Sequence, residues 1–348
     1  MRVTRSLPLG DWRKVATAAK RAEGLGCDVL MTSEIQHDPF VPLALAALAT
    51  ERVELTSAIA VAFPRSPMVV ANTSWDLQNN SGGRFVLGLG SQVRGHNVRR
   101  FSTPWSAPVP RLREYVQALR AIWRCWERGE KLDFDGDHYR FSLMTPEFAP
   151  EPTGLPPVPI AISAVGPAML KMAGRICDGV RLHGFCTRRY LEEVALPRVL
   201  QGLEQGGRER TSFDVWGGGF AATAADDDAL RESMDWIRYR IAFYGSTPAY
   251  ADVLRLHGWD DLHQELHALS RAGRWDEMAR RVSDEVVETF AAVATYDGIV
   301  DAVRKRFGGL VDGNGVMFPE DAPEGVQREI LQELRGIPSP FVGFATSW

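Results

Sequence analysis

Residues able to move protons stand directly after several short apolar runs of the sequence. If these runs are parallel strands, their carboxyl ends meet at one rim, and the side chains that follow them meet there as well. A histidine titrates near neutral pH and can give or take a proton beside a carboxylate. The spacing therefore predicts acid–base chemistry at one rim, unless these are turn residues only. They are Glu34 and His37 after residues 28–32, His96 after residues 84–90, and His183 at the end of residues 178–183.

A tight turn at Val165, Gly166 and Pro167 leads from an apolar run into a helical pattern that begins with Ala168 and Met169. Free backbone N–H groups at the start of a helix, together with the helix dipole, favour a phosphate or a carboxylate. Glycine followed by proline also precedes many helices that bind nothing. The turn therefore indicates an anion site without establishing one.

Other motifs for cofactors and metals are incomplete. Gly88, Gly90 and Gly95 lack the G-x-G-x-x-G spacing of a dinucleotide site. His263 and His267 are one helical turn apart, as metal ligands can be, but no third ligand is near them, which favours surface histidines and no metal site. The four cysteines form no C-x-x-C pair and are expected to be reduced thiols. They are Cys27, Cys125, Cys177 and Cys186.

The elements that must position these residues alternate along the chain. Eight short runs, several of them apolar throughout as in strands covered on both faces, are separated by amphipathic stretches. This alternation predicts an α/β fold, a closed (β/α)8 TIM barrel, with a doubly wound open sheet as the alternative. The runs are residues 2–7, 28–32, 53–60, 84–90, 158–164, 178–183, 213–221 and 314–318.

Helical patterns fill the intervals between these runs. The clearest covers residues 110–128, and Ser66 followed by Pro67 is typical of a helix start. Three tryptophans lie on apolar helix faces and are expected in the core, namely Trp123, Trp126 and Trp236.

Length and composition agree with one barrel domain over residues 1–348, with insertions at about 130–157, after the fourth helix, and 244–281, between the seventh and eighth strands. The chain is 45% hydrophobic and 24% charged with a formal net charge of −4, which excludes a disordered chain and argues against a nucleic-acid partner. No segment has the pattern of a signal peptide or a membrane span, so a soluble cytoplasmic protein without a membrane partner is expected.

Several segments, in order along nearly the whole chain, resemble the bacterial luciferase-like monooxygenase superfamily, and the last two resemble its actinobacterial branch of coenzyme F420-dependent oxidoreductases. The segments are 63–71 (FPRSPMVVA), 81–92 (SGGRFVLGLGSQ), 164–169 (AVGPAM), 173–179 (AGRICDG), 242–250 (AFYGSTPAY) and 256–259 (LHGW).

The resemblance implies a (β/α)8 barrel that binds the deazaflavin F420 across the rim. Glu34 matches an acidic residue near the ring, and Ala60 matches a residue against the ring, close to a non-prolyl cis peptide expected within residues 57–60. His96 matches a polar side chain that reaches the cofactor, and His183 lies near its tail. The loop that binds the cofactor phosphate through backbone N–H groups is matched by Val165, Gly166, Ala168 and Met169.

The chain departs from one branch of this family. In the sugar-phosphate dehydrogenases a histidine follows the acidic residue and a glutamate lies beyond the fourth strand, whereas this chain has Ile35 and Val93. That acid and base are therefore missing, so a different small molecule is expected as substrate, and Glu34 and His37 are the candidate catalytic residues. The candidate partners of the phosphate and glutamates of the cofactor tail are Arg94, Arg99 and Arg100.

Three functions are consistent with the resemblance. The first is hydride transfer between F420 and an unidentified small organic substrate, in which the cofactor carries the chemistry. The second is an FMN-dependent monooxygenase that uses reduced flavin and oxygen, and the third is a flavin- or deazaflavin-binding protein without turnover. Because family members often dimerise, a homodimer is expected.

Overall fold

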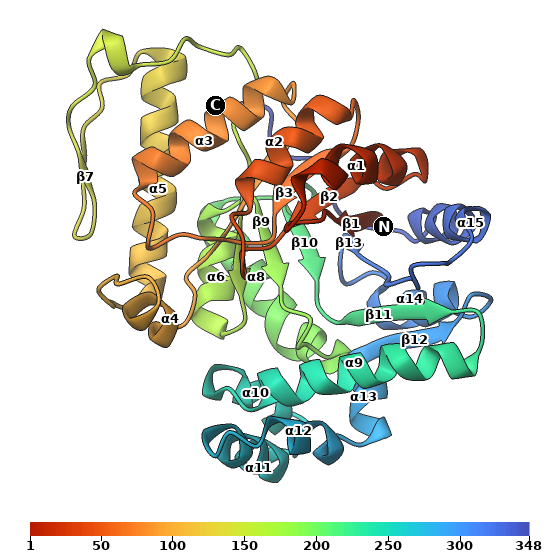
Figure 1. Ribbon diagram of the computed structural model, residues 1–348. Helices are drawn as coiled ribbons and strands as arrows, with labels where there is room; N and C mark the ends of the chain where they lie inside the picture. Colours follow the sequence, from red (N-terminus) through yellow and green to blue (C-terminus); the bar gives the residue numbers. More distant parts are fainter. Residues whose placement is uncertain (348) are drawn as a thin grey trace.

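The computed structural model describes residues 1–347, and their central element is a closed parallel barrel (Figure 1). Its strands follow one another in the order β3, β2, β1, β13, β10, β9, β8 and β5, and pairing between β3 and β5 closes the ring. The predicted (β/α)8 barrel is confirmed. The strands are β1 (Arg2–Ser6), β2 (Val29–Thr32), β3 (Glu54–Ser57), β5 (Phe85–Gly90), β8 (Ile160–Ala164), β9 (Gly179–Leu182), β10 (Asp214–Gly217) and β13 (Gly313–Asn314).

Helices surround this barrel and follow its strands (Figure 1). The predicted start at Ser66 is confirmed, because its hydroxyl accepts a hydrogen bond from the N–H of Met68. The outer helices are α1 (Val15–Gly24), α2 (Phe40–Ala49), α3 (Pro67–Asn80), α5 (Pro108–Arg128), α6 (Pro167–Ile176), α8 (Leu196–Gly206), α14 (Ile299–Phe307) and α15 (Glu324–Arg335).

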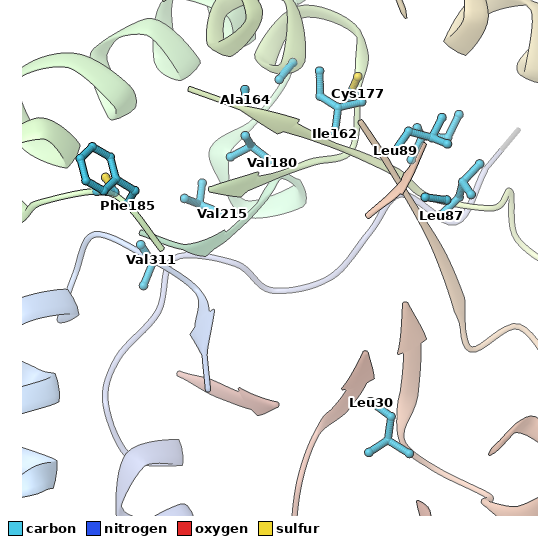
Figure 2. Close-up of a cluster of buried hydrophobic side chains, with 14 of the residues drawn as sticks. Leu30, Leu87, Leu89, Ile162, Ala164, Cys177, Val180, Phe185, Val215 and Val311 are labelled. Carbon is cyan, nitrogen blue, oxygen red and sulfur yellow. The ribbon is translucent and has the colours of Figure 1, made fainter. Parts of the chain in front are cut away.

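The apolar core lies between the strands and these helices. Figure 2 shows buried strand residues from this layer, among them Leu30, Leu87, Ile162 and Val180. Burying aliphatic side chains of this size contributes roughly 1.5–3 kcal/mol each. The outer layer therefore supplies most of the driving force for folding.

Charged side chains occupy the inside of the barrel. Arg2 lies 3.0 Å from Glu54 and 2.6 Å from Asp214, and Asp214 lies 2.5 Å from Arg181. Since β3 and β10 stand on opposite walls, these contacts pass through the barrel interior. Burial acts to raise the pKa of Asp214, but the two guanidinium charges outweigh burial and hold that pKa below its usual range. These two arginines and two acidic side chains form one cluster, which we call the interior quartet.

The predicted strand over residues 213–221 is broken into two. After β10 the chain leaves the barrel, and β11 (Phe220–Ala224) pairs in parallel with β12 (Ala291–Thr295) outside it (Figure 1). The break lies at Gly217, Gly218 and Gly219, whose φ angles of 92°, 93° and 155° are rarely adopted by other residues. The prediction missed that this glycine run ends one strand and starts another.

The predicted last strand, residues 314–318, is shorter than expected. Only Gly313–Asn314 belongs to the barrel, while Met317 forms an isolated parallel bridge with Ala222 of β11. The chain therefore passes from the barrel wall to the outer pair of strands within a few residues.

The two insertions have defined structures. Residues 130–157 contain the antiparallel strands β6 (Phe134–Asp135) and β7 (Arg140–Phe141). Residues 244–281 begin at the end of the long α9 and contain three α-helices, α10 to α12, which lie below the barrel in Figure 1. No helix within residues 1–347 is long and apolar enough to cross a membrane. The helices of this region are α9 (Asp227–Gly245), α10 (Ala251–Arg255), α11 (Asp260–Arg271), α12 (Trp275–Met278) and α13 (Asp284–Phe290).

The paired histidines of α11 have structural partners. The Nδ1 atom of His263 lies 2.7 Å from the carbonyl oxygen of Gly245, and the Nδ1 atom of His267 lies 2.9 Å from that of Ser246. These hydrogen bonds attach α11 to the end of α9. A role in holding the insertion together accounts for the spacing of the two rings.

Candidate functional site

Glu34 connects two strands at the carboxyl rim. Its backbone N–H donates to the carbonyl of Ile59 at 3.1 Å, and its side-chain Oε2 accepts from the N–H of Val61 and from Arg65, both at 2.7 Å. The side chain is 7% exposed. Burial acts to lower the pKa of Arg65, but its bonds to Glu34 and Asp38 outweigh burial and raise it. The carboxylate thus fixes β4 (Ala60–Val61) beside the end of β2.

The backbone next to Ala60 is closely packed. The Ala58–Ile59 peptide is cis, within the segment where the family resemblance implied such a bond, and Ala60 itself is fully buried. The hydroxyl of Ser57 donates to the carbonyl of Gly88 at 2.8 Å and accepts from its N–H at 3.0 Å. A Cβ on Gly88 would lie 1.8 Å from the Ser57 carbonyl oxygen, so only glycine permits this approach.

The N-terminus of α6 is open to solvent. Gly166 caps the helix and Pro167 follows it, so the first free helical N–H belongs to Ala168. The N–H of Met169 reaches back to the Gly166 carbonyl at 3.1 Å. A Cβ on Gly166 would meet no atom within 4 Å, which leaves room in front of the helix end. The carbonyl of Val165 is occupied by the hydroxyl of Tyr190, at 2.9 Å.

His183 lies beside this helix end, because β9 pairs with β8 up to Leu182 and Ala164. Its Nδ1 accepts from the N–H of Phe185 at 2.9 Å, so a neutral ring carries its proton on Nε2. Burial, with a smaller effect from the charge of Arg240, lowers the pKa of His183 to about 4. The ring is therefore a neutral hydrogen-bond donor near pH 7.

An aromatic cluster from the insertion covers His183. Its ring centroid lies 4.1 Å from that of Tyr244 and 5.1 Å from that of Tyr250. Arg240 donates to the Tyr244 hydroxyl and stands over the rings of Tyr244 and Trp236. The sequence analysis expected Trp236 in the core and used Tyr244 and Tyr250 only within the motif 242–250, so it missed this cluster. Positions 236, 240 and 244 are four apart and form one stripe of α9.

This stripe corrects the expectation for one tryptophan. Trp123 and Trp126 are buried as predicted, at 1% and 3% exposure, but Trp236 is 45% exposed. Apolar residues lie on two sides of α9, and the side with Ile237 and Ile241 packs against the core.

Two other candidate residues lie apart from these groups. His37 is exposed beside Gly10, and among the described residues no hydrogen bond joins it to Glu34. His96 is exposed on α4 (Arg94–Arg99), a helix that the sequence analysis did not predict. The neighbouring Arg100 donates to the carbonyl of Ile35, which brings α4 against the loop after β2.

A cavity of about 270 Å³ lies at the opposite end of the barrel from this rim. It is lined by residues that precede β8 and β9, including Pro159 and Asp178. Its guanidinium groups are paired, since Arg120 and Arg208 lie 2.9 and 2.7 Å from Asp178. The chemistry-bearing residues therefore belong to the carboxyl rim, and this cavity is separate from them.

Two mycobacterial proteins are similar to this chain in sequence. The chain is 50% identical over 299 residues to an uncharacterized protein of Mycobacterium tuberculosis, covering 86% of this chain and 88% of that protein. It is 30% identical over 335 residues to a putative coenzyme F420-dependent oxidoreductase of the same organism, covering 86% and 89%.

The structure of the coenzyme F420-dependent tetrahydromethanopterin reductase from Methanopyrus kandleri is similar, with a TM-score of 0.75, 20% identity and coverage of 96% and 98%. The family model for luciferase-like monooxygenases matches residues 2–313. The chain therefore belongs to the luciferase-like monooxygenase family.

Proposed function

We propose that this protein is an oxidoreductase that uses coenzyme F420 to transfer a hydride to or from a small organic substrate. The observation that carries the proposal is the open N-terminus of α6, with space in front of Gly166 and a neutral His183 nearby, an arrangement suited to a phosphate. The relative at 30% identity, described as a putative coenzyme F420-dependent oxidoreductase, supports the choice of cofactor.

The residues present fit such a group. The free N–H of Ala168 would donate to its phosphate, and the space in front of Gly166 admits it. Met169 follows in the same first turn, with its own N–H on the Gly166 carbonyl. Val165 forms the turn before this helix start, and the Nε2–H of His183, on the neighbouring strand end, is the candidate for a further donor. When bound, the deazaflavin supplies the hydride chemistry, and the protein supplies orientation and exclusion of water.

On the other side of the rim, we assign the ring position to Ala60 and β4. Its small side chain leaves room for a flat ring, and Glu34 holds its strand through Val61. Glu34 also places a carboxylate beside the reacting centre. His37, three residues further on and exposed to solvent, is the candidate for proton exchange with water. His96 would approach the cofactor from α4.

The insertion at residues 244–281 is the candidate substrate wall, because its Tyr244 and Tyr250 pack on His183 at the rim.

Two residues of the rim bear on the choice of substrate. Ile35 and Val93 are exposed apolar residues at 57% and 38%, in positions where sugar-phosphate enzymes carry an acid and a base. Apolar side chains there do not donate or accept protons, which favours a substrate other than a sugar phosphate.

We further expect a cytoplasmic homodimer. Sedimentation measurements test the dimeric state directly.

Paired fluorescence titrations of the purified apoprotein with F420 and with FMN test the cofactor. We expect tight binding of F420 and weaker binding of FMN. Because FMN also carries a phosphate, the reverse preference would assign the protein to the flavin monooxygenases, and binding of neither would refute the proposal. Binding without hydride exchange in either direction would instead indicate a carrier protein.

A further inference from the structure

Arg240 differs from the other arginines of its helix. On α9, Arg231 pairs with Asp228, and Arg238 lies 2.6 Å from Asp284. Within residues 1–347, no carboxylate lies within salt-bridge distance of Arg240, and its Nε is buried without an acceptor. A partly desolvated guanidinium without a counter-charge is unfavourable, so such a group requires an explanation.

Aromatic rings hold this guanidinium in one orientation. Its central carbon lies 5.3 Å from the centroid of Trp236 and 4.8 Å from that of Tyr244, and one Nη donates to the Tyr244 hydroxyl. Rings at these distances attract a cation and limit the rotation of its plane. The guanidinium is therefore oriented in advance, while its Nε has no acceptor.

Arg240 lies near the carboxyl rim of the barrel. Tyr244, which it contacts, packs on His183, and His183 follows the strand that neighbours the Val165–Gly166 turn. The ring of His183 is neutral and supplies no negative charge. The missing counter-charge is therefore expected from a molecule that binds at the rim.

We propose that Arg240 recognises an anionic group, a carboxylate or a phosphate, of a ligand bound at the rim. This inference rests on the proposed function in so far as the rim is the ligand site. The anion has two possible sources, namely the phosphate–glutamate tail of the cofactor or an acidic substrate. A planar guanidinium suits either, because it can donate two parallel hydrogen bonds.

The first arm of the test concerns the cofactor tail. Arg240→Met and the control Arg231→Met, an exposed arginine on the same helix, are compared by thermal unfolding and then titrated with F420 and with its tail-less deazaflavin core. If the tail supplies the anion, Arg240→Met weakens F420 binding by about tenfold or more and leaves the core unaffected. Arg240→Gln, which keeps hydrogen-bonding capacity, replaces the first variant if that one does not fold.

The second arm concerns the substrate and uses benzoate and phenyl phosphate as probes, with benzyl alcohol as the neutral control. Binding is followed by tryptophan fluorescence, because Trp236 contacts Arg240. If the substrate supplies the anion, the wild-type protein binds an anionic probe at least about tenfold more tightly than Arg240→Met does, and F420 affinity is unchanged in both.

The two proposals can fail separately. If the wild-type protein does not bind F420, the proposed cofactor is wrong, while the probes still report on Arg240. If Arg240→Met alters neither F420 affinity nor probe binding relative to Arg231→Met, the proposal for Arg240 is wrong.

Discussion

Replacing Gly166 with valine separates cofactor binding from folding. The residue has φ −74° and ψ 152°, which valine adopts readily, and a Cβ there would meet no atom within 4 Å. The free energy of unfolding should therefore change by less than about 1 kcal/mol. The added methyl groups would occupy the space in front of the Ala168 N–H, where we place the cofactor phosphate.

The loss of affinity can be estimated from the bond that is blocked. A hydrogen bond to a charged group contributes about 1.5–3 kcal/mol, which corresponds to about 10- to 150-fold in Kd. We expect Gly166→Val to weaken F420 binding by a factor in this range in a fluorescence titration. Gly325→Val is the control for an added side chain near a helix start, because Gly325 is the second residue of α15 and, like the cap residue Gly166, has open space around its Cβ position.

Two results would refute this reasoning. Unchanged F420 affinity in Gly166→Val would show that the phosphate does not lie at the start of α6. A large loss of stability in Gly166→Val alone would show that the space in front of Gly166 is filled by the protein, so that a change in affinity could not be attributed to the ligand.

Three further predictions concern the barrel. Asp214→Ala leaves the buried Arg181 without its carboxylate and the partly buried Arg2 with Glu54 alone, and should destabilise the protein by about 3–5 kcal/mol in urea unfolding. A loss below about 1 kcal/mol would contradict the interior quartet. Gly88→Ala should prevent the contact with Ser57 and lower the melting temperature markedly, and an unchanged temperature would mean that the strands separate easily. The pKa of His183 is about 4 in the folded protein and about 6.5 in the unfolded chain. Its contribution to the free energy of unfolding, at most about 3 kcal/mol, is therefore present above pH 6.5 and is lost as the pH falls towards 4. His183→Phe should reduce this dependence between pH 7.5 and 4.5, and an equal slope in both proteins would count against a buried neutral ring.

The barrel could be predicted because its strands are buried on both faces. Runs such as residues 84–90 and 158–164 are apolar almost throughout, and helix starts such as Ser66–Pro67 carry local signals that need no tertiary contact. The broken strand at Gly217 could not be predicted from hydrophobicity, because both of its halves are strand-like and only their partners differ.

The site could be predicted only in part from the sequence, for a related reason. The chain order predicts that the turn at Gly166 lies at the rim, together with the residues that follow each strand, because parallel strands end at one rim. The contact of Tyr244 with His183 joins residues 61 positions apart through the insertion, and no local pattern encodes how the insertion packs. Glu34 was named for its charge, whereas its attachment to Val61 depends on the path of the backbone.

The interior quartet also bears on how the barrel reaches its correct strand alignment. Its members come from β1, β3, β9 and β10, and successive residues of a strand point to opposite faces. A slip of one residue in any of these strands would turn one charge outward into the apolar layer and leave its partners unmatched inside. Misaligned closures are thereby penalised electrostatically, so the quartet acts as a check on strand register while the barrel forms.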